Sequence, residues 1–388
     1  MKNHAFLTLT IALLFGLTVL VAVQPALADR LSDAIAQAPQ GTGIGQIDTT
    51  SPPGFLGIPG AVSPNLVLTF LWAVWVGWIF STVGAFGGVM AGVGHISVLG
   101  IGKYAGQFKD TAPTLNKLIT DSIRVSNQFL VGMSALISSI TYQRLGRLVL
   151  PLGLSLAAGS IIGSYLIPWL TAGKVTFKAY VGYFGIFVLA LGILMLYETT
   201  PAGRAKKKKA KQAADAFEAA MKKMRSGEQV DTKALGVKVQ SITPSKFSFT
   251  FYGVEFSFNP FYPVIGGFVI AAISSFIGVG GGFLLVPFLT SISGLPMYLA
   301  AGTSAFAVLV GMITSIFSYL QQGSIVHWPL IGLEMVGIVV GSVIGPRTAK
   351  YIPDIWLKRL FVILAFYVGI DYVLLGFVGK DLMKLLLG

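Results

Sequence analysis

The stretch that decides the fold is Ser275 to Pro287, SFIGVGGGFLLVP, which places three consecutive glycines in apolar surroundings. Glycine-rich loops of soluble enzymes bind phosphates, but GVGGG does not satisfy GxGxxG, because Phe283 stands where the third glycine belongs. No P-loop GK[ST] follows, and no formal charge occurs between Glu255 and Glu334. The sequence therefore indicates glycines that interrupt a membrane helix rather than a nucleotide site.

Composition supports a membrane protein. Of the 388 residues, 54% are hydrophobic and 11% are charged, and the mean hydropathy is +0.77, whereas soluble domains carry about 25% charged residues. The net charge of +13 comes from Lys and Arg clustered in loops, which orients membrane proteins and does not require nucleic acid. With no cysteine and three scattered histidines, we expect no disulfide, metal site or cofactor.

The N-terminus is typical of a signal peptide or signal anchor over residues 1–28. A basic start precedes an apolar core at 6–23 and the small-residue motif Ala26-Leu27-Ala28. Residues 29–64 would then be a periplasmic lead-in, which shows no helical period and is rich in Pro, Gly, Ser and Thr. The remaining segments are transmembrane repeat 1 at 65–197, a basic cytoplasmic loop at 198–258 and transmembrane repeat 2 at 259–388.

The repeat is clearest between residues 151–168 and 329–346. PLGLSLAAGSIIGSYLIP and PLIGLEMVGIVVGSVIGP share Pro, Leu, Gly, Gly, Ser and Pro at identical spacing. Each contains a GxxxG pair, which lets two helices approach closely in lipid. GAFGG at 84–88 likewise matches GVGGG at 278–282. The chain therefore contains two copies of one unit.

Positive charges predict how the copies are oriented. If each glycine-broken segment turns back to the side it entered from, 18 Lys and Arg residues face the cytoplasm and nine face outward, with Lys2 set aside. Full crossings would reverse this bias, which opposes the positive-inside rule. The predicted fold is an all-α polytopic membrane protein of two inverted repeats. Each repeat is a glycine-broken re-entrant hairpin plus three transmembrane helices, an arrangement typical of secondary transporters.

The cytoplasmic loop is predicted to be a small α+β insertion. Residues 205–225 are rich in Lys and Ala and should be helical, while KFSFTFYGVEFSFNP reads as a β-hairpin turning at Tyr252-Gly253. Its apolar face would consist of Phe247, Phe249, Phe251, Phe256 and Phe258. The lysines at 206–209 are a topology signal that attracts anionic lipid, or a docking site for a cytoplasmic partner.

The glycines are candidate binding residues. In hydrocarbon, a broken helix is tolerated where it is buried in protein or lines a wet cavity. Its free N–H groups and positive dipole end suit an anion. Tight helix packing alone is the alternative. The candidate glycines are Gly84, Gly87, Gly88, Gly278, Gly280, Gly281 and Gly282.

Polar residues recur after both glycine clusters. Ser126 and Asn127 align with Thr303 and Ser304, and we expect each pair to begin a helix just after a hairpin. There they would cap the helix or bind a polar substrate as a paired site across the pseudo-twofold axis.

Ionisable residues inside apolar segments are functional candidates by default. Glu334 lies mid-helix and could carry a coupling proton or pair with an interior donor. His95 lies in the first hairpin, as an anion donor, a titrating group or a structural histidine. Arg124 could attract an anion at the outer mouth or be a solvated loop charge. No Ser–His–acid set with local support occurs, so we do not expect an enzyme.

GVGGGFLLVP, then AGTSAF, then a GxxxG-bearing helix resembles the sulfite exporter TauE/SafE family of membrane transporters. Residues 260–378 carry the pattern well, and residues 65–197 match more loosely, with GAFGG, Val93 in place of proline and Ser-Asn in place of Thr-Ser. The resemblance implies a multi-pass permease of the bacterial inner membrane for sulfite, organosulfonates or related small sulfur oxyanions. Together with the inverted repeats, it leads us to expect export by alternating access. Its partners would be that anion and the lipid bilayer, with a homo-oligomer left open.

Two other functions remain open from the residues alone. One is a channel or carrier for another small anion or polar solute. The other is a membrane-anchored protein whose basic loop docks a cytoplasmic partner.

Overall fold

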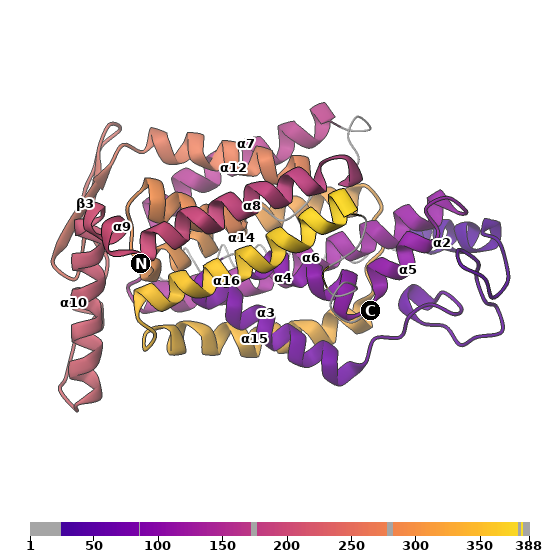
Figure 1. The fold of residues 1–388 in the computed structure, drawn as a ribbon, viewed down its shortest axis with the longest axis horizontal. Helices are drawn as coiled ribbons and strands as arrows, with labels where there is room; N and C mark the ends of the chain where they lie inside the picture. Colours follow the sequence, from indigo (N-terminus) through magenta and orange to yellow (C-terminus); the bar gives the residue numbers. More distant parts are fainter. Residues whose placement is uncertain (1–24, 85, 172–176, 278–281, 379–381, 383–388) are drawn as a thin grey trace.

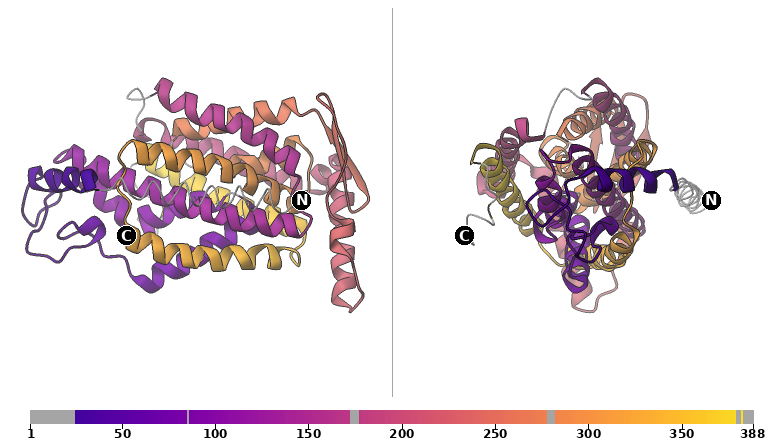
Figure 2. Two further views of the ribbon diagram at one scale, coloured as in Figure 1. Left: turned by 180° about the vertical axis from the view of Figure 1, so that it is seen from behind. Right: turned by 90° about the vertical axis from the view of Figure 1, so that its right-hand side faces the viewer.

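The computed structural model describes residues 25–378 except 85, 172–176 and 278–281, together with residue 382. The described chain is a bundle of helices with a smaller structure at each end (Figure 1). We call these ends the lead-in end, where residues 29–64 lie, and the insert end, where residues 200–258 lie. Figure 2 shows from behind how the helices run between the two ends.

The bundle has two halves in chain order. The first comprises α3 (Leu66–Val83), α4 (Gly87–Val93), the π-helix η3 (Gly94–Val98), α5 (Ile101–Gln107), α6 (Pro113–Arg144), α7 (Leu150–Thr171) and α8 (Phe177–Thr199). The second comprises α12 (Phe261–Ile277), α13 (Gly282–Pro287), the π-helix η4 (Phe288–Ile292), α14 (Met297–Gln321), α15 (Trp328–Ala349), α16 (Asp354–Val373) and the π-helix η5 (Leu374–Val378).

The first long apolar segment breaks at its predicted glycine cluster, and the second is described on both sides of residues 278–281. α3 ends at Val83 and α4 begins at Gly87, while α12 ends at Ile277 and α13 begins at Gly282. Gly84 lies in the first break with φ 83° and ψ −167°, a backbone conformation that is essentially restricted to glycine. The prediction that glycines interrupt the helix is confirmed for the first segment, and for the second it falls on residues 278–281, which lie outside the described residues.

Each broken segment begins and ends at one end of the bundle. α3 begins at the lead-in end, and Leu99, just beyond η3, shares an apolar cluster with Phe55 of the lead-in. α12 begins at the insert end (Figure 1), and Ser291 of η4 hydrogen-bonds Glu198 there. The two broken segments therefore enter the bundle from opposite ends.

The broken helices pack on the opposite half. α3 lies along α15, and α12 lies along α7. A Cβ at Gly337 or Gly341 would strike carbonyl oxygens of α3, and a Cβ at Gly159 or Gly163 would strike those of α12. The predicted GxxxG faces therefore do bring helix backbones together, and they join one half of the bundle to the other.

Four of the described helical stretches are long and apolar enough to cross a membrane, namely Leu66–Val83, Met297–Gln321, Trp328–Ala349 and Asp354–Val378. Large apolar side chains such as Leu66, Leu71, Ile193 and Ile363 are exposed on the outside of the bundle. Exposed apolar side chains on long apolar helices are expected to face lipid. The fold is therefore that of a polytopic membrane protein.

The lead-in differs from our expectation of an irregular segment. Helix α2 (Pro25–Gln37) forms at its start, and it contains the expected cleavage point after Ala28. Leu31, Phe55 and other apolar side chains of the lead-in pack on α5 and the start of α6. The prediction of no helical structure was wrong because the segment buries its apolar residues against these helices.

The insert has the predicted α+β character. It contains α9 (Pro201–Lys206), α10 (Lys208–Arg225), α11 (Thr232–Leu235), β1 (Lys238–Ile242), β2 (Phe247–Phe251) and β3 (Val254–Phe258). The strands form an antiparallel sheet in the order β1-β2-β3. The turn at Tyr252-Gly253 has two positive φ values, as a two-residue hairpin requires. The predicted hairpin and helix are confirmed, and β1 is an additional strand.

Phe249→Ala should loosen the insert without unfolding the bundle. The Phe249 side chain is fully buried and stacks on Phe256 at a ring-centroid distance of 5.3 Å. Truncating a buried phenylalanine costs about 3–5 kcal/mol, so limited proteolysis should cut the Phe249→Ala insert much faster than that of the wild type. Ser257→Ala, on the exposed side of β3, is the matched control. Equal cleavage rates for Phe249→Ala and the wild type would contradict this packing.

Candidate functional site

A buried polar cluster lies inside the bundle, formed by His95, Asn127 and Glu334. The Nδ1 of His95 is 2.5 Å from Oδ1 of Asn127, and its Nε2 is 2.9 Å from one oxygen of Glu334 and 3.1 Å from the other. The side chains of His95 and Glu334 are 1% and 3% exposed. Three residues from η3, α6 and α15 thus meet, with His95 and Glu334 buried and Asn127 half-buried.

Local packing fixes the histidine. His95 follows α4, the returning arm of the first glycine-broken segment. The indole of Trp72 in α3 donates to the carbonyl of Met90 in this arm at 3.2 Å. Gly94 lies against the same indole, leaving no room for a side chain. The return arm is therefore pinned to α3, and the imidazole points across to α6 and α15.

The cluster holds a proton between two groups. Since Oδ1 of Asn127 accepts, Nδ1 of His95 must donate, so the proton in question lies between Nε2 and the Glu334 carboxyl. It sits on the carboxyl if the pair is neutral and on the ring if the pair is ionic. Either arrangement satisfies both groups in a buried site, and the pair can exchange a proton without breaking its contact.

The two glycine-broken segments meet near the centre of the bundle. Phe86, within the first cluster, and Phe283, directly after the second, make an edge-to-face contact with ring centroids 6.1 Å apart. A Cβ at Gly84 would overlap Val286 of α13 and lie 2.9 Å from Oγ of Ser304 on α14. The described parts of the two glycine clusters therefore lie next to each other, with Ser304 beside them.

The polar pairs after the hairpins are inside helices, not at their starts. Ser126 lies about three and a half turns into α6, and Thr303 lies about two turns into α14. The prediction that these pairs begin helices, and with it the capping alternative, was wrong, because α6 begins at Pro113 and α14 at Met297, well before the polar pairs. Ser126 and Ser304 donate to carbonyls of their own helices, and Thr303 Oγ1 accepts from the backbone N–H of Val149 at 3.2 Å.

The other candidates divide into three groups. Gly87, Gly88 and Gly282 are buried in α4 and α13. Gly278, Gly280 and Gly281 lie outside the described residues. Arg124 is 39% exposed and lies 3.6 Å from Asp121 on the same helix, so it is not part of the buried cluster.

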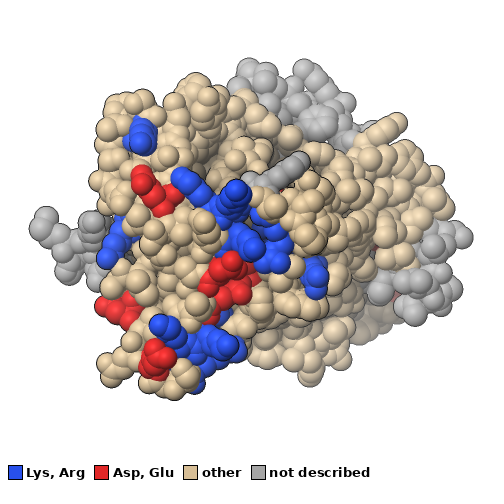
Figure 3. Space-filling view, turned by 60° about the vertical axis from the view of Figure 1, so that its left-hand side comes forward, with Lys and Arg blue, Asp and Glu red and all other residues tan. Residues whose placement is uncertain are grey.

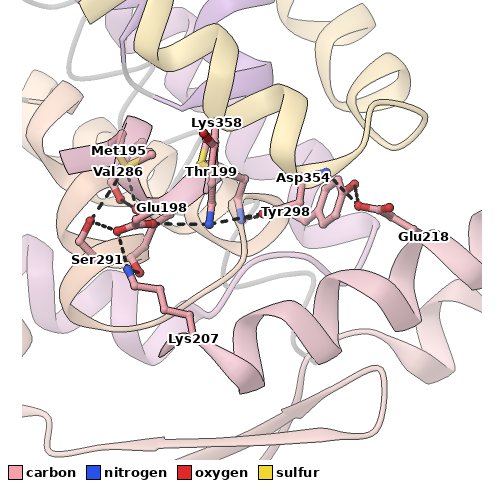
Figure 4. Close-up of polar contacts among 12 residues, drawn as sticks. Met195, Glu198, Thr199, Lys207, Glu218, Val286, Ser291, Tyr298, Asp354 and Lys358 are labelled. Carbon is pink, nitrogen blue, oxygen red and sulfur yellow. Dashed lines mark hydrogen bonds and ion pairs between the residues drawn. The ribbon is translucent and has the colours of Figure 1, made fainter. Parts of the chain in front are cut away.

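The insert end holds a second polar cluster that the sequence did not reveal (Figure 4). Glu198 at the end of α8 is almost fully buried, and Lys207 lies 2.5 Å and Lys358 3.5 Å from its oxygens. Lys207 also donates to the carbonyl of Thr290 at 2.6 Å, and Ser291 donates to Glu198. The cluster ties the insert, α8 and α16 to η4, the last turn of the second broken segment.

The same network continues to the start of α14. Glu218 of α10 accepts from the Tyr298 hydroxyl at 3.0 Å and from the backbone N–H of Asp354 at 2.9 Å. Asp354 in turn accepts from the backbone N–H of Met297 at 2.6 Å. An adjoining cavity of about 50 Å³ is lined by Lys207, Lys358 and other charged residues. In the sequence, the clustering of these charged residues beside apolar segments was the one feature that could have indicated this polar network.

Broken helices that face each other inside a membrane bundle, beside a buried ionisable cluster, define a membrane transporter rather than an enzyme. The sequence model of the sulfite exporter TauE/SafE family matches residues 68–372. The chain belongs to this family.

Individual relatives agree with this assignment. A probable membrane transporter protein of Methanocaldococcus jannaschii is 34% identical over 115 residues, which are 28% of this chain and 43% of the relative. A probable membrane transporter protein of Haemophilus influenzae is 31% identical over 127 residues, 30% of this chain and 47% of the relative. TauE/SafE family protein 5 of Arabidopsis thaliana is 32% identical over 97 residues, 25% of this chain and 22% of the relative.

The chain thus spans less than half the length of each of these relatives. No solved structure gave a significant match.

Proposed function

We propose that this protein exports small sulfur oxyanions, such as sulfite or organosulfonates, across the bacterial inner membrane by alternating access of two inverted halves. The observation that carries the proposal is the meeting of two glycine-broken segments, entered from opposite ends, at Phe86 and Phe283. Reciprocal packing of α3 on α15 and α12 on α7 supports the inverted relationship. In secondary transporters, such a meeting point is where the substrate binds.

The glycine clusters would bind the anion through their backbone. N–H groups freed at the broken ends of α4 and α13 replace part of the water around the anion. The candidates are Gly84, Gly87, Gly88, Gly278, Gly280, Gly281 and Gly282. Hydroxyl and amide groups from both halves complete the site, namely Ser126, Asn127, Thr303 and Ser304.

The His95–Glu334 pair would carry the coupling proton. His95 is about 12 Å along the return arm from Gly87, close enough for a change at the glycine site to move the ring. Because His95 belongs to the first half and Glu334 to the second, rocking of the halves would separate the pair and expose its proton. This links proton transfer to the step that moves the anion.

The insert end would face the cytoplasm. Figure 3 shows Lys and Arg side chains gathered at that end among acidic ones, and residues 198–255 contain 12 Lys and Arg residues. Positive residues are retained on the cytoplasmic side. The lead-in end would then face the periplasm.

Purified protein in liposomes should move [35S]sulfite with saturable kinetics that respond to a proton gradient. Saturation follows from a single site that must reorient for each anion, and the gradient acts through the His95–Glu334 proton. The measurement is initial flux against sulfite concentration, with and without a pH difference, beside sulfate, chloride and an alkylsulfonate. Flux that rises linearly with concentration would instead indicate a channel, and no flux of any anion would favour a docking protein.

A further inference from the structure

Arg147 is the largest fully buried side chain of the described residues and lies in the turn between α6 and α7. Its Nη2 donates to the carbonyl of Pro346 at 2.6 Å. Its Nη1 is buried and has no hydrogen-bond partner among the described residues. The guanidinium carbon lies 4.7 Å from the ring centroid of Tyr142 and 5.6 Å from that of Phe217.

The charge of Arg147 lacks a counter-ion. Among the residues that the structure describes, no carboxylate lies within ion-pair distance of it. Burial lowers the pKa of the guanidinium, and only nearby tyrosines oppose this effect, yet an arginine stays protonated in proteins. An unpaired buried charge is strongly destabilising. We therefore expect an anion to pair with the Arg147 guanidinium in another state of the protein.

The insert is what covers Arg147. Phe217 of α10 lies over the guanidinium, and the backbone N–H of Val237 donates to the carbonyl of Gly146 at 2.8 Å. The insert also binds the second half, since Glu218 accepts from Tyr298 and Lys207 donates to Thr290. It therefore bridges both halves at the insert end.

The turn that carries Arg147 also packs against the central helices. A Cβ at Gly302 would lie 2.6 Å from the Arg147 carbonyl oxygen, and Thr303 holds the N–H of Val149. Arg147 therefore lies between the insert and the segment AGTSAF at 301–306.

We propose that Arg147 is the anion-binding residue of an inner vestibule and that residues 201–258 are the lid that closes over it. This inference rests on the proposed function and adds a second binding position to the central one. When the lid lifts, Phe217 leaves the guanidinium, and Nη1 becomes free to hold one oxygen of a small oxyanion. A planar guanidinium binds such oxygens with paired, charge-assisted hydrogen bonds.

The test compares Arg147→Gln with Arg144→Gln, which removes the same charge from an exposed position of the same turn. In oriented liposomes, [35S]sulfite flux is measured with sulfite supplied at the insert side or at the lead-in side. Loss of a charge-assisted hydrogen bond should raise the half-saturating concentration at the insert side about tenfold or more for Arg147→Gln. Arg144→Gln should match the wild type, and Arg147→Lys should fall between.

Hydrogen exchange of the wild-type protein provides a second readout. Sulfite should accelerate exchange at the Val237 amide, which is bonded to Gly146 only when the lid is closed, and Arg147→Gln should abolish this acceleration. An unchanged insert-side half-saturation in folded Arg147→Gln overturns the inference while the proposed function stands. If that variant does not fold, a Val237 exchange rate that ignores sulfite in the wild type overturns it. Absence of saturable wild-type flux overturns the proposed function itself.

Discussion

Glu334→Gln is expected to abolish the coupling of sulfite movement to protons while leaving folded protein in the membrane. Glutamine has nearly the shape of glutamate, and its amide N–H can donate to Nε2 of the neutral His95 ring, which lies 2.9 Å from the carboxylate in the wild type. It cannot take or release a proton. A gradient of one pH unit acting through one proton is worth about 1.4 kcal/mol, which supports about tenfold anion accumulation. Accumulation by Glu334→Gln should fall to about equal concentrations on both sides.

The measurement is the accumulation of [35S]sulfite at steady state with an imposed pH difference. Glu255→Gln is the matched control, because Glu255 is an exposed carboxylate of β3, outside the bundle. It should accumulate sulfite as the wild type does. Accumulation by Glu334→Gln at the wild-type level would remove the His95–Glu334 pair from coupling, although a sulfite carrier driven through other residues would survive that result.

Local patterns predicted those parts of the fold that depend on neighbouring residues. The break at Gly84 follows from glycines within an apolar run, and the hairpin at Tyr252-Gly253 follows from alternating Phe and Ser. The close approach of two helix backbones at Gly341 also has a local sequence signature, because a GxxxG face predicts that another helix packs closely against it. It does not name the partner, and that partner proved to be α3 of the other half.

Contacts between distant residues escaped prediction. His95 and Glu334 are 239 positions apart in the sequence. Each residue was therefore recognisable as a candidate by itself, but the sequence contained no sign that the two would pair. Lys207, Glu198 and Thr290 likewise come from three elements. The lead-in looked irregular because its apolar residues are widely spaced, and only the surface of α5 and α6 gives them something to pack against.

Arg147 shows how one signal can have two meanings. In the sequence it counts as a positive charge in a turn, which predicts the side of the membrane. The structure buries Arg147 beneath Phe217, and no carboxylate of the described residues pairs with it. A charge that only sets membrane topology does not need to be buried. Burial of a charge depends on what the tertiary fold places over it, and no local pattern in the α6–α7 turn contains that information.

Gly341→Leu should produce the largest loss of stability, because it acts where the two halves join. A Cβ at Gly341 would overlap the carbonyl oxygen of Val74 and lie 2.7 Å from the backbone nitrogen of Trp78. These are backbone atoms of α3, so no side-chain rotation can relieve the clash, and α15 must move away. Overpacking costs about 1–3 kcal/mol where side chains can adjust, and more is expected here.

Gly332→Leu is the control on the same helix, since a Cβ at Gly332 meets no atom within 4 Å. In detergent, the melting temperature of Gly341→Leu should fall well below that of Gly332→Leu, which should stay near the wild type. Gly159→Leu should repeat the effect, because its Cβ would overlap the carbonyl oxygen of Val264 where α7 meets α12. If only one of these two interface variants destabilised the protein, the reciprocal joining of the halves would be wrong, because both contacts should hold the bundle in the same way.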